Sequence, residues 1–149
     1  MSSPRSDRRR PESVLVVVHT VSGDVLLLKR TIPFEFWQSV TGSLAAAEEP
    51  IDAASRELLE ESGLTDEGVL TFTGVSRQFA IDPRWRDRFP PGTVENVEYE
   101  YRYRLPGTID IRLCDDEHSE FCWLPVEEAI ERVWSWTNQQ ALESLRVVL

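Results

Sequence analysis

The chain has few of the residues and segments that mark disulfide-bonded or membrane-spanning proteins. Only two of its 149 residues are cysteines, Cys114 and Cys122, and they stand too far apart for a C-x-x-C redox or zinc motif. We therefore expect free thiols in a reducing cytoplasm. No stretch reaches the roughly 18 apolar residues of a membrane span, and residues 1–10 lack the apolar run of a signal peptide. The sequence predicts a cytoplasmic protein with no membrane association and a flexible basic tail over residues 1–10.

Positive charge is also scarce. The chain has 16 lysines and arginines against 26 aspartates and glutamates, which gives a net charge of -10. Because binding to a nucleic-acid backbone relies on basic side chains that displace condensed counterions, a nucleic-acid polymer is not expected as a partner. A small anionic substrate would need local positive charge from placed arginines, helix N-termini or a bound cation.

The composition is that of one globular domain over residues 1–149, with 41% hydrophobic and 28% charged residues. The β-branched run 14–18 predicts a strand buried on both faces, and residues 25–28 predict a second strand that pairs with it as a hairpin. Residues 36–40 read as a short strand that delivers Thr41 and Gly42 into a loop. The chain therefore opens with β structure.

The segment 50–62 predicts a helix, because Pro50 suits a first helical position, Gly63 suits a helix end and the interval is rich in Ala, Leu and Glu. Residues 82–93, with two adjacent prolines and a glycine, predict a loop. Further strands are expected at 70–75, 98–105 and 121–124, and further helices at 126–133 and 138–147. This order predicts an α/β fold with one mixed sheet flanked by helices.

Three carboxylates, Glu57, Glu60 and Glu61, fall within roughly 100° of arc on the predicted helix. An adjoining apolar stripe of Ile51, Ala54 and Leu58 should pack on the sheet. Like charges four residues apart are unfavourable, as are acidic side chains near a helix C-terminus. A hard divalent cation such as Mg²⁺ would compensate. From spacing alone, a solvated acidic face, which is common on helices, is the favoured alternative.

Residues 42–64 match the pattern G-x5-E-x7-R-E-U-x-E-E-x-G-U, with U aliphatic, at every fixed position. In this the chain resembles the Nudix hydrolase family. The resemblance implies an α/β/α sandwich whose loop-helix-loop motif binds a pyrophosphate and Mg²⁺, with Mn²⁺ as a substitute. It implies that Glu57 and Glu61 are the main metal ligands, and that Glu60 is a further ligand or part of the network that activates water.

The same resemblance assigns structural roles to four other motif positions. Glu48 and Arg56 correspond to the ion pair that steadies the loop against the helix, and Gly63 ends the helix. Gly42 is expected to serve a turn geometry or a close backbone approach that a Cβ would obstruct.

Outside the motif, residues 36–43, 116–118 and 135–138 resemble a Nudix subfamily that acts on dihydroneopterin triphosphate in the folate pathway. This implies that Glu117 joins the metal ligands and the catalytic set, with an exposed loop carboxylate as the alternative. Arg30, Thr41 and Ser135 would contact the substrate, although Arg30 also fits a strand-end charge and Ser135 a helix cap. Trp37, Trp134 and Trp136 would stack on the ring, or fill the core or the pocket wall. His118 is left outside the catalytic set.

Several arginines allow two interpretations, phosphate binding or solvent exposure. Arg9 or Arg10 would reach the triphosphate or belong to the tail. Three more, from the variable segment after the motif, would supply phosphate-binding charge or be solvated: Arg77, Arg86 and Arg88.

The expected function is Mg²⁺-dependent hydrolysis of dihydroneopterin triphosphate, a small-molecule triphosphate, to the monophosphate and pyrophosphate. One alternative is a nucleoside triphosphate pyrophosphatase acting on dATP or an oxidised purine nucleotide. Another, from a different class, is a Nudix-fold ligand-binding module without catalysis. The sequence leaves open a monomer or a homodimer, the number of metal ions and the identity of the general base.

Overall fold

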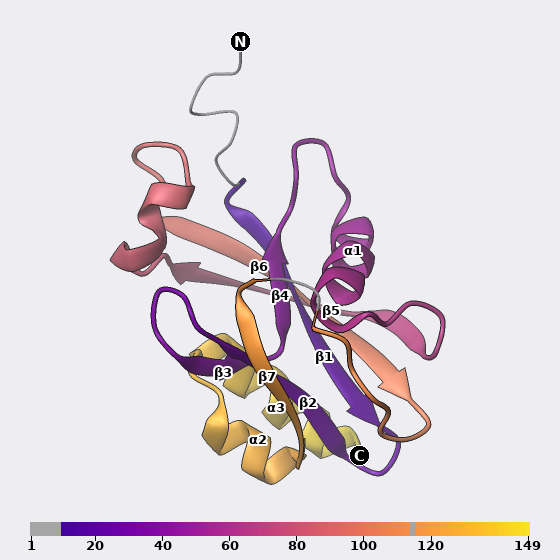
Figure 1. Cartoon of the computed structure of the whole chain (residues 1–149). Helices are drawn as coiled ribbons and strands as arrows, with labels where there is room; N and C mark the ends of the chain where they lie inside the picture. Colours follow the sequence, from indigo (N-terminus) through magenta and orange to yellow (C-terminus); the bar gives the residue numbers. More distant parts are fainter. Residues whose placement is uncertain (1–9, 114–115) are drawn as a thin grey trace.

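The computed structural model describes residues 10–113 and 116–149. Cys114 and most of the predicted tail, with Arg9, lie outside these residues. A seven-stranded mixed sheet occupies the centre, with strand order β3-β2-β1-β6-β5, while β4 pairs with β1 and β7 pairs with β2 (Figure 1). The strands are β1 (Glu12–Thr20), β2 (Asp24–Arg30), β3 (Phe36–Gln38), β4 (Val40–Ser43), β5 (Val69–Ala80), β6 (Glu95–Leu105) and β7 (His118–Pro125).

Strand β1 is buried on both faces, as its β-branched run predicts. It pairs in parallel with β6 and antiparallel with β4. Because side chains alternate along a strand, Val14, Val16 and Val18 enter one core beneath α1 (Pro50–Ser62), whereas Leu15 and Val17 enter a second core. Helices α2 (Val126–Arg132) and α3 (Trp136–Val148) cover this second core.

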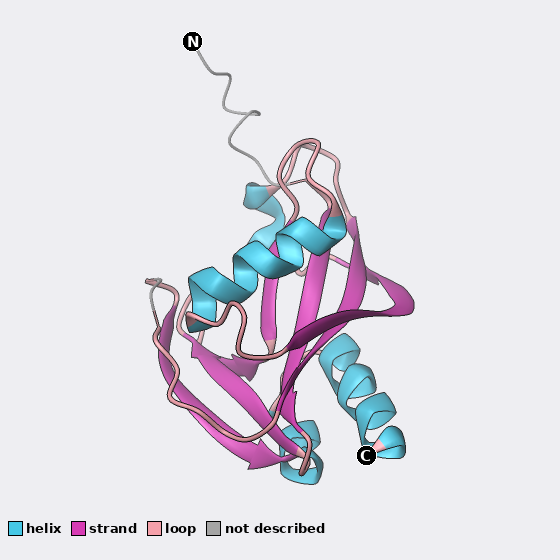
Figure 2. Cartoon of the chain, turned by 90° about the vertical axis from the view of Figure 1, so that its right-hand side faces the viewer, coloured by secondary structure: helices cyan, strands magenta, loops and turns pink. Residues whose placement is uncertain are grey.

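Helices therefore lie on both sides of the sheet, which confirms the predicted α/β/α layering (Figure 2). None of the helices within the described residues is long and apolar enough to cross a membrane.

Helix α1 has the predicted bounds. Pro50 starts it, and Gly63 ends it in the left-handed region, at φ 76°, with its N–H donating to the Leu59 carbonyl at 2.9 Å. The predicted apolar stripe is wrong at Ile51, whose side chain is 44% exposed. The buried stripe is turned toward Ala53, Ala54 and Leu58, and it brings Glu61 against the sheet as well.

Two segments predicted as loops are ordered. Thr41 and Gly42 belong to β4, because they pair with Leu15 and Val14 of β1. Residues 82–93 contain a 3₁₀ helix, η2 (Pro83–Arg88), which Asp82 caps by accepting from the Arg84 N–H at 2.9 Å. Both segments contribute residues to the main cavity of the protein, so their regular structure helps to shape it.

Candidate active site

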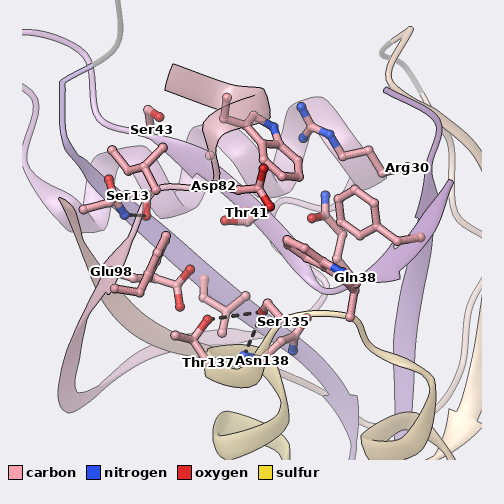
Figure 3. Close-up of a pocket in the computed structure, with 18 of the residues that line it drawn as sticks. Ser13, Arg30, Gln38, Thr41, Ser43, Asp82, Glu98, Ser135, Thr137 and Asn138 are labelled. Carbon is pink, nitrogen blue, oxygen red and sulfur yellow. Dashed lines mark hydrogen bonds between the residues drawn. The ribbon is translucent and has the colours of Figure 1, made fainter. Parts of the chain in front are cut away.

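A cavity of about 850 Å³ opens where α1, β4, β6, η2 and the start of α3 meet (Figure 3). Its size is ordinary for a small-molecule site. The fold brings most of the sequence-predicted residues to its wall: Arg30, Thr41, Gly42, Glu57, Glu60, Glu61, Arg88, Glu117, Trp134, Ser135 and Trp136.

Gly42 and Glu57 approach each other closely in the cavity wall. A Cβ built on Gly42 would overlap the carboxyl group of Glu57. The φ of Gly42 does not lie in the left-handed region, so the requirement is space rather than an unusual backbone angle. Of the two roles expected for Gly42, the close approach is the one present, and it places the Glu57 carboxylate directly against β4.

Glu61 is the most buried of the three helix carboxylates, with 4% of its side chain exposed. Its Oε1 accepts from the Thr41 N–H at 3.4 Å and lies 3.7 Å from Nε2 of His118. His118 in turn contacts the Gln38 side chain at 3.0 Å. The Thr41 hydroxyl donates to the Val14 carbonyl at 2.8 Å. Thr41 and His118 thus hold Glu61 in place.

Glu48 and Arg56 form the predicted ion pair. Nε and Nη2 of Arg56 donate to the two carboxylate oxygens of Glu48, each at 2.9 Å. Arg56 also donates to the Ser43 carbonyl and to Glu57 at 2.7 Å, and reaches Glu60 at 3.4 Å. The hydrogen bond from Arg56 lowers the pKa of Glu48 to about 2. One guanidinium therefore ties the motif loop to the carboxylate-bearing face of the helix.

Glu117 lies between two arginines at the cavity wall. Its carboxylate is 3.1 Å from Nη1 of Arg30 and 3.8 Å from Nη1 of Arg88. The Arg30 side chain is only 7% exposed, and its Nε donates to the Ile32 carbonyl at 2.6 Å. Arg30 is thus a fixed charge of the cavity wall, and Arg88 brings a second cation from η2.

Ser135 has the cap geometry that the sequence left as its alternative. It accepts from the Asn138 N–H at 3.1 Å at the start of α3, and its hydroxyl lies 3.2 Å from that of Thr137. The buried Asn138 side chain bridges to Ser39, which fixes the helix start against the sheet. Ser135 still lines the cavity, so capping and ligand contact are compatible (Figure 3).

The structure does not place Trp37 in the cavity. Alternation along β3 directs Phe36 and Gln38 into the cavity and Trp37 to the opposite face, where it packs on the core beneath α2. The aromatic wall is built by Trp134, one of the three tryptophans predicted from the sequence, together with Phe36 and Trp85. The ring centroids of these three lie 5.1 to 5.9 Å apart. Trp85 comes from η2, the segment expected to be a loop.

Two further arginines, which the sequence left between phosphate binding and solvent exposure, have defined contacts. Nη1 of Arg77 pairs with buried Glu100 at 2.6 Å, so its charge is used within the fold. Arg10 donates to the carbonyls of Ala45 and Glu48 and pairs with Glu12 at 2.7 Å. It braces the motif loop from outside the cavity.

Sequence reasoning missed two polar residues of β6, Asn96 and Glu98, which line the cavity and are 3% and 7% exposed. They stand two residues apart on one face of the strand, whereas Tyr101 and Tyr103 face the other core. The alternation of polar and aromatic residues over 96–103 was the signal available. The sequence interpretation also missed the contact of His118 with Glu61.

The divalent cation that the motif implies would need oxygen ligands from the carboxylates of α1. Across residues 10–113 and 116–149, no three His, Cys, Asp or Glu side chains gather around one point. Glu57 and Glu61 of α1, however, both present carboxylate oxygens against β4: Gly42 leaves room for Glu57, and the N–H of Thr41 donates to Glu61. Mg²⁺ is commonly held by one or two carboxylates together with water and substrate phosphate, so this pair fits it.

Comparison with known proteins agrees with this geometry. Residues 9–145 match the NUDIX domain. The chain is 36% identical over 141 residues to the dihydroneopterin triphosphate diphosphatase of Escherichia coli strain K12, covering 91% of each chain. It is 33% identical to the enzyme of the same name from Haemophilus influenzae, covering 89% of this chain and 85% of that one.

Among solved structures, the E. coli dihydroneopterin triphosphate pyrophosphohydrolase superposes with a TM-score of 0.88 at 33% identity, over 95% of this chain and 99% of that one. Sequence and fold thus agree along almost the whole chain, and the protein belongs to the Nudix family of hydrolases.

Proposed function

We propose that this Nudix hydrolase cleaves dihydroneopterin triphosphate to dihydroneopterin monophosphate and pyrophosphate in a Mg²⁺-dependent reaction of folate synthesis. The observation that carries the proposal is that one cavity joins the motif glutamates to a wall of aromatic and polar side chains at the start of α3. A triphosphate and a bicyclic ring need these two surroundings at once. The relatives named for this activity support the same substrate.

The cavity offers both carboxylates that would hold a cation and arginines that would bind phosphate oxygens. Glu57 and Glu61 would hold Mg²⁺, which when bound neutralises charge on the phosphate oxygens. Arg30 and Arg88 provide positive charge in the same cavity, where they pair with Glu117. Phosphate oxygens entering the cavity would compete with Glu117 for both guanidinium groups.

Two carboxylates are placed to accept a proton from an attacking water. Glu60 has 52% of its side chain exposed at the cavity rim, and Glu117 has 33% exposed. Glu61 is buried and occupied by Thr41 and His118, so it serves as a fixed ligand rather than a mobile base. Glu117, proposed from the sequence as a metal ligand, would reach that role only after release from the arginines.

The test compares dihydroneopterin triphosphate, dATP and 8-oxo-dGTP in parallel, with Mg²⁺ or with EDTA, and identifies the products by mass. Preferential Mg²⁺-dependent release of pyrophosphate from the pterin supports the proposal. Preference for a purine triphosphate overturns the substrate assignment but keeps the mechanism.

The variants Glu57→Gln and Glu61→Gln should lose most turnover. Glu143→Gln, an exposed carboxylate of α3 outside the cavity, is the matched control. A ligand-binding module without catalysis would show no turnover in the unmodified protein and unchanged ligand affinity in Glu61→Gln.

A further inference from the structure

Two side chains of the 3₁₀ helix η2 face the cavity together. In a helix of this kind, residues three positions apart lie on the same face. Trp85 and Arg88 stand at this spacing, and both line the cavity. Trp85 belongs to the aromatic wall, whereas Arg88 pairs with Glu117. One short helix therefore supplies the cavity with both an aromatic ring and a positive charge.

Arg84 holds η2 against the segment between β2 and β3. Its guanidinium lies over the ring of Phe34, 4.1 Å from the ring centroid. It also pairs at 2.8 Å with Asp82, whose carboxylate caps η2. These contacts use the charge of Arg84 within the fold, so Arg88 is the cation that η2 presents to the cavity.

The cavity is strongly acidic. Its described lining residues include two arginines, Arg30 and Arg88, against seven aspartates and glutamates. Release of pyrophosphate breaks the bond between the first and second phosphates, where a cation held by Glu57 and Glu61 would neutralise charge. A third phosphate adds negative charge beyond that bond. In these acidic surroundings, it needs an arginine as its partner.

Arg88 can exchange its present partner more easily than Arg30 can. The Arg30 side chain is 7% exposed, and it is held by the Ile32 carbonyl at 2.6 Å and by Glu117 at 3.1 Å. The Arg88 side chain is 29% exposed, and its ion pair with Glu117 spans 3.8 Å, which is longer than a hydrogen bond. Such a solvated pair contributes little, whereas an arginine can form two parallel hydrogen bonds to a phosphate.

We propose that Arg88 binds the terminal phosphate of the substrate and thereby selects triphosphates over diphosphates, while Trp85 on the same face of η2 contacts the ring. The inference rests on the proposed hydrolysis of a triphosphate. It deepens that function by naming the residue that responds to the length of the phosphate chain.

The test compares two ligands that differ only in the terminal phosphate. Dissociation constants would be measured in Mg²⁺ for the α,β-methylene analogues of dATP and dADP, in which a P–C–P linkage replaces the bond that is cleaved. The variants are Arg88→Ala, Trp85→Ala and Arg86→Ala. Arg86 provides the matched control, because it is an exposed arginine of the same helix and does not line the cavity.

The unmodified protein should bind the triphosphate analogue about tenfold or more tightly than the diphosphate analogue. Arg88→Ala should lower this ratio about tenfold by weakening the triphosphate analogue alone. Its unchanged affinity for the diphosphate analogue would show that the variant is folded. Trp85→Ala should weaken both analogues and keep the ratio, because the ring is common to both. Arg86→Ala should keep both affinities.

A triphosphate analogue that binds no more tightly than the diphosphate analogue overturns the inference, as does an unchanged ratio in Arg88→Ala. An equal loss in Arg86→Ala also overturns it, because the effect would then follow net charge alone. The proposed function fails separately. If dihydroneopterin triphosphate is not cleaved, the two dissociation constants still decide whether Arg88 binds the terminal phosphate.

Discussion

The carboxyl group of Glu57 occupies the space that a side chain at position 42 would fill. This contact links the first residue of the Nudix motif to a proposed metal ligand fifteen positions later. Because Gly42 has no side chain, the strand that carries it can pass this close to helix α1. The first prediction follows from this contact.

Gly42→Ala should reduce kcat about a hundredfold, because the new methyl group displaces the Glu57 carboxylate by steric overlap. The free energy of unfolding should fall by only about 1–3 kcal/mol, as for other overpacked sites. Steady-state kinetics and urea unfolding would measure the two effects. Gly107→Ala is the matched control, since a Cβ there meets nothing within 4 Å. Near-normal kcat in Gly42→Ala would show that Glu57 does not need this position.

The side chain of His118 is predicted to position Glu61 without touching substrate. Replacing it with Ala removes the contact at 3.7 Å and leaves Gln38 without its partner. Residues that orient metal ligands in this way typically contribute 10- to 100-fold to metal affinity or activity. His118→Ala should raise the Mg²⁺ concentration needed for half-maximal rate by about tenfold.

A titration of rate against Mg²⁺ measures this shift. His19→Ala, another buried histidine but one outside the cavity wall, should cost stability and leave the Mg²⁺ dependence unchanged. An unshifted Mg²⁺ curve for His118→Ala would reduce the role of His118 to packing.

Sequence patterns anticipated the elements whose boundaries are set locally. Pro50 and Gly63 determine where α1 begins and ends, so its bounds were predicted correctly. The β-branched run of β1 likewise required burial on both faces. Thr41 and Gly42 were assigned to a loop because β4 exists only through pairing with β1, which no local pattern reveals.

The polar contacts of the site depend on residues far apart in the chain. Arg30 meets Glu117 across 87 positions, and Asn96 meets Ser13 across 83. Family resemblance identified the motif carboxylates but not Glu98, which becomes buried only when β6 and the start of α3 come together at the cavity. The sequence left Trp37 between ring stacking and core packing, because the adjacent aromatic residues 36 and 37 do not reveal which of them faces the cavity.

Glu98 should make stability depend on pH. Its pKa is about 7 in the folded chain against an ordinary value of 4.5, and the charged neighbours facing it are Arg77 on β5 and Glu100 on β6. Because the pKa of Glu98 is higher in the folded chain than in the unfolded chain, deprotonation of Glu98 lowers the free energy of unfolding. This contribution to stability is fully present below pH 4.5 and is lost as the pH rises through 7. The difference corresponds to roughly 3 kcal/mol.

Urea unfolding of Glu98→Gln and of the unmodified protein, from pH 5 to 8.5, measures this contribution. The difference in unfolding free energy between the two should move in favour of the variant as pH rises. Glu143→Gln should run parallel to the unmodified protein. Parallel curves for Glu98→Gln would mean that Glu98 is already ionised at pH 5.

The aromatic wall provides a last prediction, which separates Trp134 from Trp37. The Trp134 ring lies 5.1 Å from Phe36 and 5.5 Å from Trp85, and its side chain reaches the cavity. Trp134→Ala should raise KM for the triphosphate substrate about tenfold, because stacking on an aromatic ring contributes on the order of 1–3 kcal/mol.

Trp37→Ala should instead lower the unfolding free energy by about 2–4 kcal/mol with little change in KM, because Trp37 packs on the core beneath α2. Measuring both variants for KM and urea unfolding distinguishes the two sides of β3. A raised KM for Trp37→Ala with normal stability would restore Trp37 as the stacking residue and would require β3 to present its other face to the ligand.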